Sequence, residues 1–114
     1  MSFPYSNFTA ISDYQFGRLL TTDITQSITL TNDDLNGKVI RISSATTSSI
    51  TITLPDAFNG ANCIIINGSN HNHTLTILAG NTLNYNQTTH PLPTSKRVHH
   101  VYGFDVNQKD WYAD

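Results

Sequence analysis

Apolar and polar residues alternate along several short stretches of the chain. The clearest is 50–54, Ile-Thr-Ile-Thr-Leu, where every second residue is apolar. The stretches 26–31 and 73–78 show the same period of two. Because side chains of a β-strand point alternately to opposite faces, each stretch predicts a strand with one buried face.

Residues that favour turns separate these stretches. Asn36-Gly37 tolerates positive φ, and Pro55 ends a strand because proline has no N–H to donate. The consecutive isoleucines 64–66 predict burial on both faces of their strand. The segment 87–95, with two prolines, is expected to be a loop. Further strands are expected at 38–43, 63–67, 82–85, 97–106 and 111–112.

The pattern yields seven or eight short strands, spaced about 8–12 residues apart. This spacing is typical of a small antiparallel β-sandwich or barrel. No internal repeat is evident. Glu is absent, and Ser, Thr and Asn make up a third of the chain, a composition poor in helix formers. We therefore predict one all-β domain over 24–114.

Residues 1–23 fit neither a strand nor a helix and predict an extended arm. The arm holds five of the ten Phe and Tyr residues of the chain. Aromatic side chains need a surface that buries them. The arm either folds back onto its own domain or inserts into a neighbouring subunit or a host particle. Its candidate interface residues are Phe3, Tyr5, Phe8, Tyr14 and Phe16.

Charge and cysteine usage narrow the range of partners. Only 12% of residues are charged and the net charge is −2. No basic cluster exceeds Lys96-Arg97, so nucleic acid is not expected as a partner. Cys63 is the only cysteine and is expected in the core. Neither a secretion signal nor a membrane-spanning segment is expected.

The histidines are the first candidates for chemistry. His71 and His73 share one face if they lie on a strand. A zinc site would need a third imidazole from His90, His99 or His100, and partners for the ligands are scarce. Hydrogen bonding at the surface or at a subunit interface is the simpler expectation. No metal and no cofactor are therefore expected.

Catalytic motifs are not found in the sequence. There is no Gly-x-Ser-x-Gly, and Asp33-Asp34 lies in a predicted turn, where Asp is favoured by local hydrogen bonding. We therefore predict no catalytic residues and no enzymatic activity. A sugar-stacking platform is an alternative role for the aromatic residues near the C-terminus, although packing of Trp111 over the end of the core is the simpler expectation. The candidate glycan contacts are His71, His73, Tyr102 and Trp111.

The order of several motifs over 28–112 resembles a module found in tailed-phage virion proteins. The segment 28–40, ITLTNDDLNGKVI, is similar to the opening strand, Asp-containing segment and Gly of that module. The segment 50–56, ITITLPD, is similar to its strand ending in Leu-Pro. Gly60 followed by 64–67, then LTILAG at 75–80 and the terminal Trp111, completes the order.

The resemblance implies a β-rich module that usually trimerises and has no enzymatic activity. It places the protein in the virion, assembled in the host cytoplasm, with itself and the major capsid protein or another virion protein as partners. A single module with a short arm resembles a capsid decoration protein more than a complete fibre. The alternative is a tail-fibre or receptor-binding tip that recognises host-surface carbohydrate.

Overall fold

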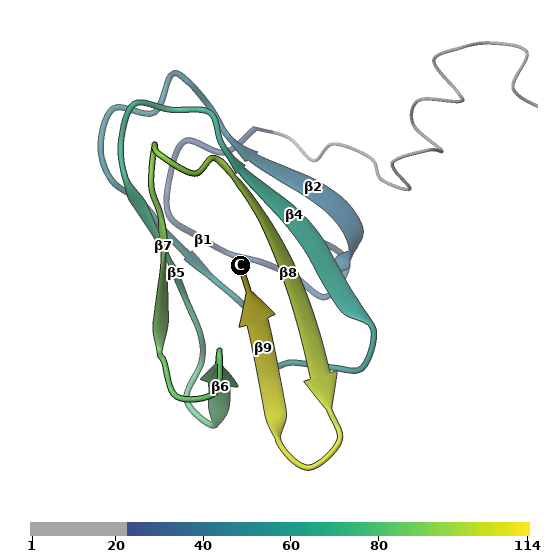
Figure 1. Ribbon diagram of the computed structural model, residues 1–114. Coiled ribbons are helices and arrows are strands. Elements are labelled where there is room, and N and C mark those ends of the chain that lie inside the picture. The colour runs from purple at the N-terminus through teal and green to yellow at the C-terminus, as the bar shows by residue number, and fades with distance from the viewer. Residues whose placement is uncertain (1–22) are drawn as a thin grey trace, which may run out of the picture.

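The computed structural model describes residues 23–114, which form nine β-strands and no helix (Figure 1). The all-β prediction is confirmed for this part of the chain. The strands are β1 (Ile28–Thr29), β2 (Asn36–Ile42), β3 (Thr51–Thr53), β4 (Ala61–Asn67), β5 (His73–Thr76), β6 (Asn81–Leu83), β7 (Thr89–Leu92), β8 (Val98–Asp105) and β9 (Lys109–Ala113).

The strands form two sheets with the core between them. The four-stranded sheet has the order β1-β3-β5-β7, and the five-stranded sheet has the order β2-β4-β8-β9-β6. Alternate residues of each strand point inward, as the period of two predicts. The largest fully buried side chains are Trp111, Leu35, Ile40, Ile42, Ile52, Leu54, Ile65, Leu75, Leu83, Leu92, His99 and Val101.

The antiparallel prediction is wrong for four of the seven strand pairs. β1–β3, β3–β5, β2–β4 and β6–β9 are parallel, whereas β4–β8, β5–β7 and β8–β9 are antiparallel. From β1 to β6 the chain alternates between the two sheets. Each return to a sheet then follows the same direction, so successive strands there run parallel. The turns before β8 therefore join strands of different sheets and do not close hairpins.

Residues 28–83 form three solenoid-like turns, β1–β2, β3–β4 and β5–β6, a repeat that sequence inspection missed. The three turns stack directly in the four-stranded sheet, through β1, β3 and β5. In the four-stranded sheet, Ile28 pairs with Ile52 and Ile52 with Leu75, at separations of 24 and 23 residues. In each turn a glycine with positive φ precedes or opens the strand of the five-stranded sheet. These are Gly37 (φ 80°), Gly60 (φ 88°) and Gly80 (φ 88°). The varying repeat length and the different loops hide the period.

Strand β7 contradicts the predicted loop at 87–95. It contains Pro91, which lies opposite Thr74 of β5. β7 is the edge strand of its sheet, with β5 as its one neighbour. Proline is tolerated at such an edge because its missing N–H would point away from the ladder.

Strand β4 also departs from expectation, because only one of its faces is buried. Ile65 is fully buried, whereas Ile64 and Ile66 are half-buried on the opposite face. The five-stranded sheet packs against the other sheet on one side only. A run of three isoleucines therefore leaves two of them on the outer surface.

Trp111 anchors the C-terminal hairpin β8–β9, which lies between β4 and β6 in the five-stranded sheet. Its side chain is fully buried, and its indole Nε1 donates to the Pro55 carbonyl at 3.0 Å. Gly103 of β8 makes room for the ring. A Cβ at Gly103 would lie 2.7 Å from Trp111 Cζ3 and 2.9 Å from the Cβ of Ala61.

Candidate functional site

The outer face of the four-stranded sheet is a ladder of threonines. Thr29, Thr53, Thr76 and Thr89 lie opposite one another across the four strands. A second row continues from Thr51 to Thr74. All six are half-buried or exposed. This surface, the threonine face, presents hydroxyl and methyl groups at the regular spacing of the strands, about 4.8 Å.

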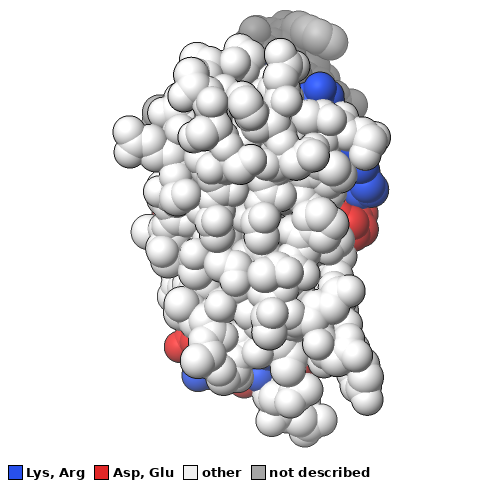
Figure 2. Space-filling view, turned by 90° about the vertical axis from the view of Figure 1, so that its left-hand side faces the viewer, with Lys and Arg blue, Asp and Glu red and all other residues white. Residues whose placement is uncertain are grey.

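Charged groups lie away from the threonine face. Figure 2 views the molecule from the side on which β5 and β7 lie in Figure 1, and Lys, Arg, Asp and Glu atoms show only near its margins. Each Lys and Arg of residues 23–114 is engaged within its own chain. Four form ion pairs: Lys38–Asp33, Arg41–Asp23, Lys96–Asp114 and Lys109–Asp56. Arg97 donates to the carbonyls of Asn67 and Ser69, at 2.8 Å each.

The outer face of the five-stranded sheet carries several apolar residues, which alternate with polar ones such as Arg41, Asn62 and His100. Its residues share the outward orientation across β2, β4, β8 and β9. Three of them are aromatic, and Phe104 and Tyr112 make an edge-to-face contact with ring centroids 5.9 Å apart. This surface, the apolar face, comprises Val39, Ile64, Ile66, Val98, Tyr102, Phe104 and Tyr112.

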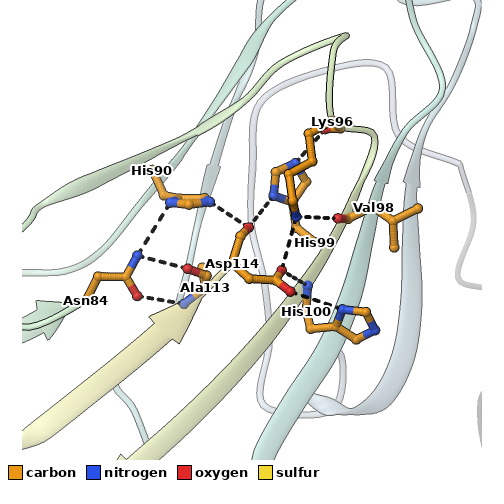
Figure 3. A network of polar contacts seen from close by, with 8 residues as sticks. All are labelled: Asn84, His90, Lys96, Val98, His99, His100, Ala113 and Asp114. Carbon is orange, nitrogen blue, oxygen red and sulfur yellow. Dashed lines mark hydrogen bonds and ion pairs between the residues drawn. The ribbon is translucent and has the colours of Figure 1, made fainter.

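A polar network holds the end of β9 against its neighbours (Figure 3). The main-chain oxygen of Asp114 accepts from His90 Nε2 at 2.8 Å and contacts His99 Nδ1 at 2.6 Å. The Asp114 carboxylate accepts from the His100 main-chain N–H at 2.7 Å. Figure 3 shows these side chains converging on Asp114 from β7 and β8. We call Asn84, His90, Lys96, His99, His100 and Asp114 the Asp114 clasp.

Asn84 completes the clasp, because its side-chain amide makes the two hydrogen bonds that a neighbouring strand would make with Ala113. Its Oδ1 accepts from the Ala113 N–H and its Nδ2 donates to the Ala113 carbonyl, both at 2.9 Å (Figure 3). Its φ of 47° lies in the left-handed region, which Asn tolerates better than most residues. The side chain therefore continues the pairing that β6 makes with β9.

The carboxylate of Asp114 stays ionised more readily than an ordinary aspartate. Partial burial raises its pKa, but the His100 main-chain N–H and the nearby Lys96 and His100 charges lower it by more, so the pKa falls below 3.8. The negative charge of Asp114 lies beside the positive charge of Lys96. The Asp114 clasp thus holds the end of β9 in place, and its imidazoles serve as hydrogen-bond partners.

A second, buried network surrounds the turn after β4. Asn67 is fully buried, and its Nδ2 donates to the carbonyls of His71 at 2.9 Å and Leu92 at 3.0 Å. Its Oδ1 accepts from the N–H of Ser69 at 3.0 Å. Ser69 Oγ in turn lies 2.6 Å from His73 Nε2. Such a network fixes the turn because every buried polar group has a partner.

The distance between Ser69 Oγ and His73 Nε2 would suit a nucleophile and its general base. The proton of His73, however, lies on the nitrogen that faces Ser69. His73 Nδ1 accepts from the Ile50 N–H at 3.0 Å, so that nitrogen carries no proton. Neutral His73 then holds its proton on Nε2 and donates it to Ser69. Burial, with a smaller effect of His71, lowers the pKa of His73 and favours this neutral form. In this arrangement His73 cannot accept a proton from Ser69.

The structure separates the candidate glycan contacts. Tyr102 lies on the apolar face and is 46% exposed, and His71 is half-buried. Trp111 and His73 are buried, so their assignment as glycan contacts is corrected: both serve the core. The five arm aromatics lie outside the described residues. Cys63 is buried, as expected.

Within residues 23–114, no three His, Cys, Asp or Glu side chains gather in a way that would hold a metal ion. The same residues include no helix with the length and hydrophobicity needed to cross a bilayer.

Sequence reasoning missed the residues that hold the two networks, Asn67 and Asn84. An Asn at the end of a strand is a weak signal, because it is equally common in exposed turns. The partners of Asn84 lie 29 positions away in sequence. Only the insertion of the β8–β9 hairpin beside β6 brings them together.

Comparison with known proteins gives no relative for the chain: no family model, no curated protein and no solved structure matches it.

Proposed function

We propose that this protein is a non-enzymatic structural component of a tailed-phage particle, a capsid decoration protein that binds and stabilises the head shell. The order of motifs over 28–112 supports this proposal. Two of these segments also lie in similar places in the fold, since Gly37 at the start of β2 and Gly60 just before β4 mark the beginnings of two paired parallel strands.

The observation that carries the proposal is the uncharged threonine face. Docking there removes no charged group from water, so the largest desolvation cost is avoided. Threonine side chains are β-branched and already restricted at χ1, and the strands hold them in register. Binding through this face therefore loses little conformational entropy, which suits a permanent contact with a shell.

The partners in this proposal are the coat protein and further copies of the chain. A protein that binds only the assembled shell stabilises it by mass action. Trimers, as the resemblance implies, would place three threonine faces on one shell. Each face could then bind weakly while the trimer remains attached, because binding of linked modules is cooperative through effective concentration.

Binding to undecorated heads tests the proposal. The full chain with Thr53→Asp and Thr74→Asp places two charges in the middle of the threonine face. We expect binding to fall by at least about tenfold, since each carboxylate loses water on docking. Thr47→Asp, in an exposed loop, is the matched control and should bind like the natural chain. Equal binding by all three proteins, or none by the natural chain, contradicts the proposal.

A receptor-binding tip is the second candidate, favoured by the aromatic part of the apolar face. Tyr102, Phe104 and Tyr112 are each close to half exposed, and exposed rings of this kind stack on sugars. A glycan array tests this function directly. Binding that is lost in Tyr102→Ser but kept in Tyr85→Ser would favour the tip, because Tyr85 is exposed elsewhere.

A further inference from the structure

Tyr85 is the most exposed large apolar side chain of residues 23–114. Its exposed fraction is 82%, and it lies in the loop that joins β6 to β7 (Figure 1). A single exposed aromatic residue is common on protein surfaces and needs no explanation by itself. The backbone conformation and the position of Tyr85, however, distinguish it from an ordinary surface residue.

The loop holds Tyr85 in a strained backbone conformation. Its φ is 79°, in the left-handed region, where a bulky residue is a rare outlier. The Asn86 N–H donates to the Asn84 carbonyl at 3.0 Å, so Tyr85 is the central residue of a γ-turn. A γ-turn with this sign of φ is rare and strained. Strain of this kind persists only where the surrounding structure enforces it, and it is found most often at functional sites.

The surrounding structure fixes both sides of this turn. Leu83 and Gln87 exchange two main-chain hydrogen bonds, at 3.2 and 2.8 Å. The Asn84 N–H donates to the Trp111 carbonyl at 2.9 Å, which attaches the turn to β9. The tyrosine therefore projects from an ordered base. A side chain whose base is already ordered loses less conformational entropy when it binds, so its contacts contribute more to affinity.

This loop adjoins the threonine face. Thr89, the last residue of the threonine row across the four strands, follows Tyr85 by four positions. Thr76 of the same row donates from its Oγ1 to the Thr88 carbonyl at 3.2 Å. The stretch 78–95 contains no Lys, Arg, Asp or Glu, so the loop continues the uncharged surface beside it. Tyr85 thus lies at the margin of the surface proposed to bind the shell.

A surface of threonines offers contact area but few residues that contribute strongly to affinity. Most of the binding energy of a protein interface comes from a few side chains, among which Tyr is enriched and Thr is under-represented. The contacts around such anchors exclude water and contribute little energy themselves. The threonine face has the properties of these surrounding contacts, and Tyr85 has the properties of an anchor.

We propose that Tyr85 is the anchor residue of shell binding and inserts into a pocket of the coat protein, an inference that rests on the proposed function. Such a pocket has apolar walls for the ring and an acceptor for the phenolic hydroxyl, because a buried Tyr O–H needs a partner. A protein pocket is favoured over a sugar as the occupant. A sugar would cover one face of the ring, whereas a pocket would enclose the whole exposed side chain.

Binding of full-chain variants to undecorated heads tests this assignment. Tyr85→Ser should weaken binding by at least about tenfold, as truncation of an anchor usually does. Val106→Ser is the matched control and should bind like the natural chain, because Val106 is 77% exposed in the turn between β8 and β9. Equal binding by Tyr85→Ser and the natural chain overturns the assignment and leaves the proposed function intact. Absence of binding by the natural chain contradicts the proposed function as well.

Tyr85→Gly separates a role in binding from a role in the fold. Glycine adopts a φ of 79° without strain, so this variant should unfold at a temperature no lower than that of the natural chain. Its binding to heads should nevertheless fall as in Tyr85→Ser. A clearly lower unfolding temperature would overturn the proposal, because the ring would then support the fold. A glycan that the natural chain binds and Tyr85→Ser does not would also overturn it, because the occupant would then be a sugar.

Discussion

At the scale of single residues, the close contact between Gly103 and Trp111 shows where sequence reasoning ends. The burial of Trp111 was one of two roles that the sequence left open. The need for glycine at 103 was not predictable, because the ring that excludes a side chain there comes from the neighbouring strand. A glycine within a strand signals a close approach, but the sequence does not name the partner.

We expect Gly103→Ala to destabilise the domain by about 1–3 kcal/mol, the usual cost of overpacking a core. The added Cβ overlaps both Trp111 and Ala61. Urea unfolding measures the change. Trp111→Phe in the same chain removes the ring atoms that overlap with the added Cβ. The double variant should therefore lose less stability than the two single variants lose together. Additive effects would show that the overlap is not the cause.

His73 makes stability depend on pH. Its pKa lies below 6.5 because burial, with a smaller effect of His71, disfavours the charged form. Above pH 6.5 both folded and unfolded chains hold it neutral. As the pH falls below 6.5, the unfolded chain takes up a proton first, so stability decreases until the folded-state pKa is reached. The free energy of unfolding should fall between pH 7.5 and pH 5.5, and less so in His73→Gln.

At the scale of elements, strands were predictable and their partners were not. The alternation at 50–54 places β3 within a residue of its observed bounds. Strand β7 was missed because its sequence, Thr-His-Pro-Leu, shows no alternation of apolar and polar residues and contains a proline. Its pairing with β5 makes it a strand. The parallel pairing followed from how the loops cross between sheets, which turn residues do not reveal.

The three positive-φ glycines offer a test of the stack. Gly80 has φ 88°, and a Cβ there would meet nothing within 4 Å. Gly80→Ala should therefore cost only the backbone strain of an L-residue, about 1 kcal/mol. Gly60→Ala, with the same φ and equally open space, should cost about the same. Clearly different shifts of the two variants in thermal unfolding would contradict the equivalence of these turns.

The role of Asn84 can be tested at the end of β9. Asn84→Ala removes both hydrogen bonds to Ala113, and we expect a loss of about 1–3 kcal/mol because main-chain groups lose their partners. Hydrogen exchange should accelerate at the Ala113 amide and stay unchanged at Ile65 in the core. Uniform acceleration across the domain would mean that the effect is global and not a local release of β9.

At the scale of the whole molecule, the fold separates two kinds of outer surface. The four-stranded sheet presents threonines, and the five-stranded sheet presents aliphatic and aromatic residues. The strands of the two sheets nevertheless have similar alternating sequences. The scarcity of charge on both outer surfaces could be read from the sequence, in which only 12% of residues are charged. Which residues share a face could not be predicted, since it depends on the order of strands in the sheets.

The most direct test of the central claim is a reconstruction of the intact particle that resolves this protein. The account predicts density for it on the head, with the four-stranded sheet of β1, β3, β5 and β7 turned toward the shell. Density at the tail, or on the head with the threonine face turned to solvent, would contradict it.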